Sequence, residues 1–580
     1  MTNQVPGLLS FHFWNAVLLT VAISLVLLAW YRRAVARSMR SVAHTPEAEG
    51  SAADGNAVVP EAAAAGSADA VSKAPRGNHT GTDEQRLRTR LILVYTAAGA
   101  ASAAVSTTLF LIGLGDQLYP VRTFATWYIY CWPIVPTLAA LLAAPQRRAL
   151  LGFGGYVLVG AAIVIVWSAL LRFALGRADA DPFRNVQSYF VLLALNAWLP
   201  FLIILVTGNR RLRSVSPFVL AALLIFSFSN LVTGNALVVA FDYQIFRDHF
   251  TSFDVRLMRG LWFMLAALPV GYLCWRGLSW LSRHFERKAF SDSQLLVDSW
   301  WLIVVFQQTV SFANYFGWGG LAGLLAFVAY RSVVALGLTF WRTANSGAGG
   351  GRLLLLRVFG FQRRTERLFD LIAQRWRLRG SVKLIAGPDL AMRTIDPADF
   401  IAFVGGRMQR LFLRSTRDLT KRIGRLDEAR DPDGRFRIGK FYCHEDTWRP
   451  TLSELLLQSD LVLMDLRGFS AANSGCEFEL RQLAASGLLP RTLFVIDDAT
   501  DIGLFKVTTN QQLIQCGLED AAAVSLNLEP VRSSSASGLQ RVYKRLRALA
   551  FASADSKTRT EVRSDEPTQT LWPSTLLRPT

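Results

Sequence analysis

The chain has 580 residues, of which 52% are apolar, and a formal net charge of +19 at pH 7. The apolar residues crowd into long runs before about residue 341, which excludes an ordinary soluble domain for the first half of the chain. Five scattered cysteines without a Cys-x-x-Cys spacing argue against a disulfide framework and a zinc ribbon.

Eight apolar runs are long enough to cross a bilayer, which takes roughly 20 residues because every backbone polar group must be satisfied within the helix. They are residues 11–30, 91–113, 123–144, 150–171, 189–207, 217–239, 260–279 and 299–341. At about 1.5 Å per residue the last run would reach roughly 60 Å, about twice the hydrocarbon thickness, so we expect two helices that turn near residues 314–320. The sequence therefore predicts nine spans.

Orientation follows from the positions of Arg and Lys beside the predicted spans. The first ten residues carry no charged side chain, and the span at 11–30 lacks a small-residue cleavage site, so it reads as an anchor. Four arginines directly follow it: Arg32, Arg33, Arg37 and Arg40. Because positively charged loops stay inside, we expect an external N-terminus in the inner (cell) membrane and a cytoplasmic location after residue 341. A single crossing by residues 299–341 would place that part outside.

Polar residues at membrane depth leave a transport pathway open as an alternative. They are Asn230, Asn235, Gln307, Gln308, Asn314 and Arg331. Arg331 is the only charge clearly inside a predicted span, and an intramembrane charge marks a functional site by default. A side chain that snorkels to the interface, or a span that ends earlier, explains Arg331 as well.

Segments without apolar periodicity separate the first span, residues 1–40, from the other spans at 89–341. Residues 41–88 are rich in Ala, Gly, Ser and acidic side chains, which cannot bury enough surface to offset ordering entropy, so we expect a disordered cytoplasmic linker. Residues 342–351 form a Gly/Ser linker that lacks the Lys-Ser/Thr of a phosphate loop. The polar tail at 553–580 is expected to be disordered.

Strand-like and helix-like segments alternate between residues 352 and 552, beginning with the apolar run RLLLLRVFG. This alternation predicts a cytoplasmic α/β domain, in which helices cover both faces of a parallel sheet. Ligands of such sheets bind beyond the carboxyl ends of the strands. The residues that follow the predicted strands, and that this rule nominates, include Arg357, Phe359, Asp389, Asp446, Arg467, Ser474, Asp497 and Asp498.

The stretch SDLVLMDLRGFSAANSGCEFEL, residues 459–480, resembles a segment of two families. Four of its residues match the Gly-Thr-x-x-Glu-Leu pattern of nucleoside 2-deoxyribosyltransferases in position: Gly475, Cys476, Glu479 and Leu480. It is also similar to the Trp-Cys-x-x-Glu-Leu segment of Toll/interleukin-1 receptor (TIR) domains. Gly475 replaces the TIR tryptophan, Cys476 replaces the transferase threonine, and no TIR-like substrate loop follows residues 384–391.

The two families share a flavodoxin-like fold and a glutamate that works at an N-glycosidic bond, so the resemblance implies that fold here and a catalytic role for Glu479. A helix N-terminus also favours an ionised carboxylate, which can bind ribose hydroxyls or stabilise a developing oxocarbenium ion. In this enzyme interpretation a nucleotide such as NAD is cleaved while Arg357, Asp389 and Asp446 position it. The start LLLLRVFG also resembles the opening strand of bacterial multi-pass proteins that end in such a domain.

Other interpretations of the same residues stay open. The crevice could sense a nucleotide without cleaving it, or the domain could associate with a second copy. Glu479 could be an exposed helix carboxylate or the partner of Arg467 or Arg481. Trp448 could stack on a base or nicotinamide, or belong to the core at the start of an amphipathic helix. Cys476 is expected to be a small buried residue rather than a nucleophile.

No metal or cofactor is predicted, since His444 beside two carboxylates is not a metal-specific pattern. Basic residues recur at helical spacing: Arg407, Arg410, Arg414, Arg417, Arg422 and Arg425. They could contact anionic lipid or nucleotide phosphate, or form a solvated helix face towards the bilayer. Because positive-inside loops and a domain tethered to an anionic leaflet explain much of the net charge, no nucleic-acid partner is expected.

Overall fold

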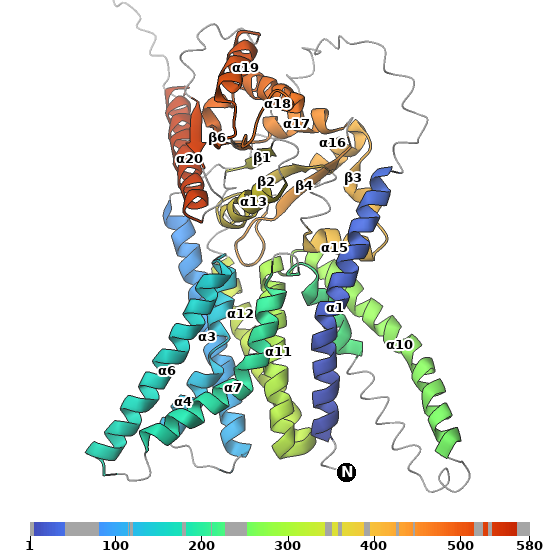
Figure 1. Cartoon of the computed structure of the whole chain (residues 1–580), viewed down its shortest axis with the longest axis vertical. Helices are drawn as coiled ribbons and strands as arrows, with labels where there is room; N and C mark the ends of the chain where they lie inside the picture. Colours follow the sequence, from blue (N-terminus) through green and yellow to red (C-terminus); the bar gives the residue numbers. More distant parts are fainter. Residues whose placement is uncertain are drawn as a thin grey trace, which may run out of the picture.

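A computed structural model of the chain places a bundle of long helices at one end and a parallel sheet with its covering helices at the other (Figure 1). The structure describes residues 5–40, 81–113, 115, 120–176, 181–209, 212–226, 252–342, 351–357, 362–387, 395–424, 429–444, 447–515, 526–531 and 536–564. α1 begins at the end of the bundle that lies away from the sheet.

Helices suit the apolar first half of the chain because they satisfy their own backbone hydrogen bonds. Within the described residues, seven helices are long and apolar enough to cross a membrane. The helical bundle consists of α1 (Val5–Arg40), α3 (Gly81–Gly113), α4 (Pro120–Tyr130), α5 (Ile134–Leu141), α6 (Gln146–Ala174), α7 (Pro182–Thr207), α10 (Ser252–Glu286), α11 (Asp292–Phe316), the 3-10 helix η2 (Gly317–Leu324) and α12 (Leu325–Arg342).

These seven helices coincide with seven of the nine predicted spans. The other two predicted spans are described only in part. Residues 217–239 are described as far as residue 226, where Ser216–Phe226 forms a shorter apolar helix. Residues 260–279 lie within α10, for which only part of the side chains are described.

The apolar run at 299–341 forms two helices, as predicted. α11 ends at Phe316, a 3-10 helix follows, and α12 then continues the run. The turn between them depends on glycine, because Gly317 has a φ of +55°, which L side chains rarely adopt. A Cβ on Gly320 would lie 2.3 Å from the backbone nitrogen of Ala313, so no side chain fits at that approach either.

The second half of the chain contains a seven-stranded sheet, and we call its strands and covering helices the α/β region. The strands are β1 (Leu353–Arg357), β2 (Val382–Ala386), β3 (Phe412–Leu413), β4 (Ile438–Cys443), β5 (Leu461–Asp465), β6 (Thr492–Ile496) and β7 (Asn527–Pro530). They lie in the order β3-β4-β2-β1-β5-β6-β7, and every neighbouring pair is parallel. The predicted parallel sheet is therefore confirmed.

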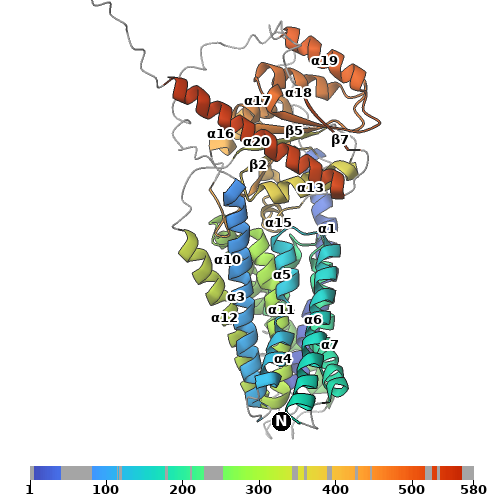
Figure 2. The ribbon, with the colours of Figure 1, turned by 90° about the vertical axis from the view of Figure 1, so that its left-hand side faces the viewer.

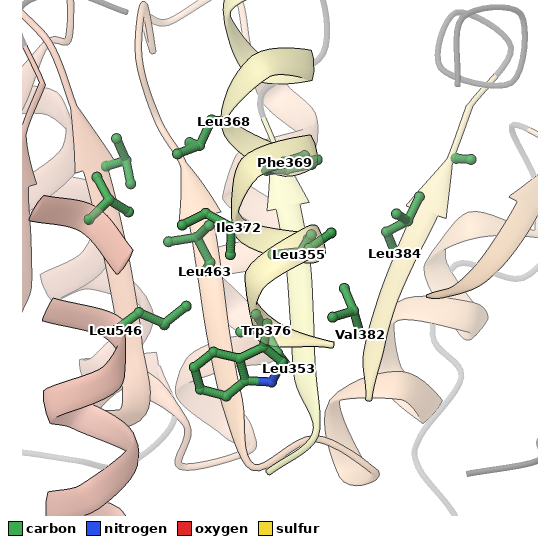
Figure 3. Close-up of a cluster of buried hydrophobic side chains, with 14 of the residues drawn as sticks. Leu353, Leu355, Leu368, Phe369, Ile372, Trp376, Val382, Leu384, Leu463 and Leu546 are labelled. Atoms are coloured by element: carbon green, nitrogen blue, oxygen red, sulfur yellow. The ribbon is translucent and has the colours of Figure 1, made fainter. Parts of the chain in front are cut away.

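Helices cover both faces of this sheet, and each face has its own apolar cluster. These helices are α13 (Gln362–Trp376), α15 (Pro397–Val404), α16 (Thr416–Gly424), α17 (Trp448–Leu457), α18 (Ser474–Ala485), α19 (Ile502–Gln515) and α20 (Ala536–Ser564). Leu353 and Leu355 of β1 pack against α13 and α20 on one face (Figure 3). Leu354 and Leu356 point the opposite way and pack against α17, α18 and α19.

The α/β region lies directly on one end of the bundle, a position seen in both views (Figures 1 and 2). Tyr31 and Val35 of α1 belong to the same apolar cluster as the inner residues of β1 and β2. Near the start of α3, the Glu84 carboxylate accepts a hydrogen bond of 3.1 Å from the Tyr543 hydroxyl of α20. It also lies 3.6 Å from the Arg379 guanidinium. Contacts across this boundary are therefore both apolar and polar.

Two helices extend beyond the boundaries expected from the sequence. α3 begins at Gly81, within the predicted linker at 41–88, and its contact with α20 explains why those first turns are helical. α20 continues to Ser564, within the predicted tail at 553–580. The rest of both segments, and most of the linker at 342–351, lies outside the described residues.

Candidate functional site

The strand order creates one point where the chain changes direction across the sheet. β1 is followed by α13 and β2 on one side, whereas β5, its other neighbour, is followed by α18 and β6 on the opposite side. The two helices cover opposite faces, so the carboxyl ends of β1 and β5 diverge into different crossovers. Doubly wound sheets bind their ligands in the crevice at such a point. Arg357 ends β1 and lies in register with Asp465, which ends β5.

The loop after β5 is held by a buried ion pair. The Arg467 guanidinium donates through Nε to Asp465 Oδ1 and through Nη2 to Asp465 Oδ2, both at 2.7 Å. The backbone nitrogen of Gly468 donates to Asp497 Oδ1 at 2.9 Å, which ties the loop to the end of β6. The bidentate Arg–carboxylate pair and the backbone hydrogen bond together hold the loop after β5 in place.

Glu479 lies on the side of α18 that faces the sheet. Cys476, Leu480 and Leu483 of the same helix are buried in the apolar cluster beneath it, and Glu479 itself is only 3% exposed. One carboxylate oxygen, Oε2, has no hydrogen-bond partner among the described residues. Burial raises the pKa of Glu479 to about 8, and the nearby positive charge of Arg357 opposes that rise. The side chain is therefore largely protonated at pH 7 when no ligand is bound.

This placement changes two interpretations drawn from the sequence. An exposed Glu479 is wrong, because the side chain is buried. The two arginines considered as its partners have other contacts: Arg467 pairs with Asp465, and Arg481 donates to the Gln512 side chain at 2.8 Å. The expectation of a carboxylate kept ionised by the helix N-terminus is also wrong for the ligand-free state, since desolvation outweighs that effect.

The other predicted site residues divide into described and undescribed ones. Phe359, Asp389 and Asp446 lie outside the described residues. Ser474 begins α18, at the N-terminus that faces the crevice, although its side chain is not described. Trp448 packs edge-to-face on Phe478, with ring centroids 5.4 Å apart, against the apolar cluster. The core interpretation of Trp448 therefore fits better than base stacking.

Cys476 and His444 were also considered as candidate site residues. Cys476 is 1% exposed, and burial raises the pKa of its thiol, so it is unsuited to act as a nucleophile at neutral pH. The His444 ring lies 5.6 Å from that of Phe412, at the end of β4. Across the described part of the chain, no group of three or more His, Cys, Asp or Glu side chains could hold a metal ion.

Polar residues in the bundle bind one another. Arg331 pairs with Asp298 at 2.5 Å, and the Tyr330 hydroxyl also donates to Asp298. Asp298 lies within the candidate span Asp292–Ala313, so the expectation that Arg331 is the only charge in a span is wrong. Gln308 accepts a hydrogen bond from Ser106. Such paired groups stabilise helix packing and do not by themselves indicate a transport pathway.

Sequence reasoning missed a second polar cluster, at the boundary between the bundle and the α/β region. Arg377, after α13, donates to both carboxylate oxygens of Asp292 at 2.7 and 2.9 Å. Arg435 donates to Ser293 at 2.6 Å, and Ser291 donates to Asp433 at 2.5 Å. These residues start α11 or lie in the α/β region some 85 to 142 positions further on, so no local pattern could have paired them.

Comparisons with known proteins add no family to this description. No family model matches the chain, and no curated protein or solved structure is significantly similar to it. The candidate function therefore depends on the geometry at the carboxyl ends of β1 and β5 and on the sequence resemblance of residues 459–480.

Proposed function

We propose that this chain is a membrane-anchored signalling or stress-defence protein whose α/β region binds a nucleotide such as NAD at the carboxyl ends of β1 and β5. The observation that carries the proposal is Glu479, a buried carboxyl group with an unsatisfied oxygen, placed beside Arg357 where doubly wound sheets bind ligands. Buried groups with strongly shifted pKa values concentrate at functional sites. The flavodoxin-like fold implied by residues 459–480 agrees with the strand order.

In the catalytic form of the proposal, Glu479 acts at the N-glycosidic bond. That bond breaks with its electron pair leaving on the base, positive charge develops at the ribose anomeric carbon, and water adds there and loses a proton to solvent. A positive charge beside Glu479 favours its ionised form, so the carboxyl group gives up its proton as the charge develops, to the departing base where that base leaves as an anion and to solvent where it leaves neutral. Arg357 would interact with the phosphates, because guanidinium groups bind phosphate oxygens bidentately, whereas Arg467 stays paired with Asp465 and holds the loop.

In the second form of the proposal, the same site senses the nucleotide without cleaving it. The specific observation that favours signalling is the buried contact between Arg377 and Asp292, which links the α/β region to the start of α11. A ligand that shifts the sheet could change the bundle through this contact, or the bundle could change the site. Self-association of the α/β region with a second copy is a further route for such a signal.

The orientation is proposed on charge. Basic residues that follow the first span favour a cytoplasmic position for the end of α1 that meets the α/β region. α1 starts at the opposite end of the bundle, in agreement with an external N-terminus (Figure 1). We therefore assign the α/β region to the cytoplasmic side of the inner (cell) membrane, with membrane lipid around the bundle.

The test is release of free base from NAD and from nucleosides by the purified full-length chain. Glu479→Gln should lower base release by on the order of a hundredfold or more, because losing one electrostatic stabiliser in a dry site costs about 3 kcal/mol. Glu477→Gln is the matched control, since Glu477 lies on the same helix and is exposed. Binding of NAD without any released base would support sensing. Full turnover by the Glu479→Gln chain would refute the role of Glu479.

A further inference from the structure

A second candidate site lies away from Glu479, near the sheet edge formed by β3 and β4. A cavity of about 850 Å³ opens between the end of α10, the amino ends of β2 and β4, and the segment from η3 (Met408–Leu411) to α16. Seven of its lining side chains are basic and two, Glu286 and Asp418, are acidic. We propose that this cavity binds a phosphate-bearing anion, either the headgroup of a membrane phospholipid or a free phosphorylated compound.

The basic side chains converge on the cavity from separate elements. Arg414, which follows β3, and Lys421 of α16 are exposed, whereas Lys383 of β2 is only 2% exposed and donates to the Gln458 side chain at 3.1 Å. Arg422 is fixed by donating to the backbone carbonyl oxygens of Leu411 and Lys440 at 2.6 and 2.9 Å. Carbonyl oxygens orient a guanidinium group but do not neutralise its charge.

The charge in this cavity is only partly balanced by neighbouring carboxylates, because seven basic and two acidic side chains line it. Among the described residues, no carboxylate oxygen lies within 4.0 Å of the charged groups of Arg410, Arg414, Lys421 or Arg422. Holding several like charges around one space is unfavourable without a counterion. A simple solvated helix face would spread these side chains outward, whereas here they surround a concave space of the size used by small-molecule ligands.

The position of α10 places the cavity near the level of lipid headgroups. The predicted span ends at residue 279, and the indole of Trp280, 54% exposed, follows at once, as is typical of the aromatic belt at a membrane interface. Glu286, which lines the cavity, is seven residues beyond residue 279, or about 10 Å along a helix. A headgroup phosphate could therefore reach the cavity, and so could a compound from the cytoplasm.

The basic side chains around this cavity suit a phosphate group better than a carboxylate. Arg414 presents a planar guanidinium group, Lys421 adds a point charge, and Arg422 adds the charge of a guanidinium already held by backbone carbonyls. This arrangement favours a group with several anionic oxygens. The site is separate from Glu479, because the residues around Glu479 at the ends of β1 and β5 do not line this cavity.

The experiment measures binding of two probes to the purified full-length chain in detergent by calorimetry. The probes are inorganic tripolyphosphate and a short-chain phosphatidic acid, with short-chain phosphatidylcholine as the zwitterionic comparison of zero net charge. Lys421→Ala combined with Arg414→Ala should weaken binding about tenfold or more, since each removes a charge-assisted contact. Arg417→Ala is the matched control, because Arg417 is exposed on the same helix but does not line the cavity.

The outcomes separate the two sources and can overturn the proposal. Binding of phosphatidic acid alone assigns the site to lipid, whereas binding of tripolyphosphate assigns it to a free phosphorylated compound. The proposal is overturned if neither probe binds, if the double variant binds as tightly as the parent chain, or if Arg417→Ala weakens binding equally. Because Arg414 and Lys421 do not belong to the site proposed around Glu479, loss of probe binding in the double variant reports on this cavity and does not depend on the function proposed above.

Discussion

Replacing Glu479 with Gln should stabilise the protein, and more so as the pH rises. Burial raises the pKa of this carboxyl group from 4.5 to about 8, so the folded chain holds the proton more tightly than the unfolded chain. Stability is therefore greatest below pH 4.5 and falls as the pH rises from there to 8. Each pH unit in this window lowers the free energy of unfolding by about 1.4 kcal/mol, so the loss of stability due to Glu479 reaches about 3 kcal/mol at pH 7. Gln keeps the shape and avoids this cost.

The assay is thermal unfolding of the full-length chain in detergent at pH 5, 6, 7 and 8. For a region of this size about 1 kcal/mol shifts Tm by roughly 2–4 °C, so the Gln variant should unfold about 6–12 °C above the parent at pH 7. The two chains should converge near pH 5. Glu477→Gln should follow the parent at every pH, because Glu477 is exposed. A Gln variant that is less stable than the parent at pH 7 would show that Glu479 is ionised and paired in the native state, contrary to its burial.

Two further predictions concern how the bundle and the α/β region fit together. Arg377→Met should destabilise the protein by about 3 kcal/mol, because it leaves the Asp292 carboxylate without its buried partner. Adding Asp292→Asn should recover part of the lost Tm. A double variant no more stable than Arg377→Met alone would contradict a stabilising role for the Arg377–Asp292 ion pair. For topology, cysteine probes placed at Thr2 and Ser346 should be labelled from outside and from inside the cell, respectively. A cytoplasmic Thr2 or an external Ser346 would exclude the nine-span orientation.

The sequence by itself determined the elements whose pattern is local. The apolar runs before residue 342 predicted long helices, and the length of the run at 299–341 predicted the break now seen at Gly317–Leu324. The alternation after residue 352 required a parallel sheet. β3 was not predicted, because it pairs over only two residues and leaves no periodic signal.

Tertiary structure alone decided the environment of the candidate residues. Whether Glu479 faced water or the core depended on how α18 packs against the sheet. Its raised pKa follows from that burial, and the rise is opposed by Arg357, which lies far away in sequence but at the end of β1. The same reason applies to Arg377 and Asp292: charge pairs formed across the fold depend on distances in space, and a sequence records only order along the chain.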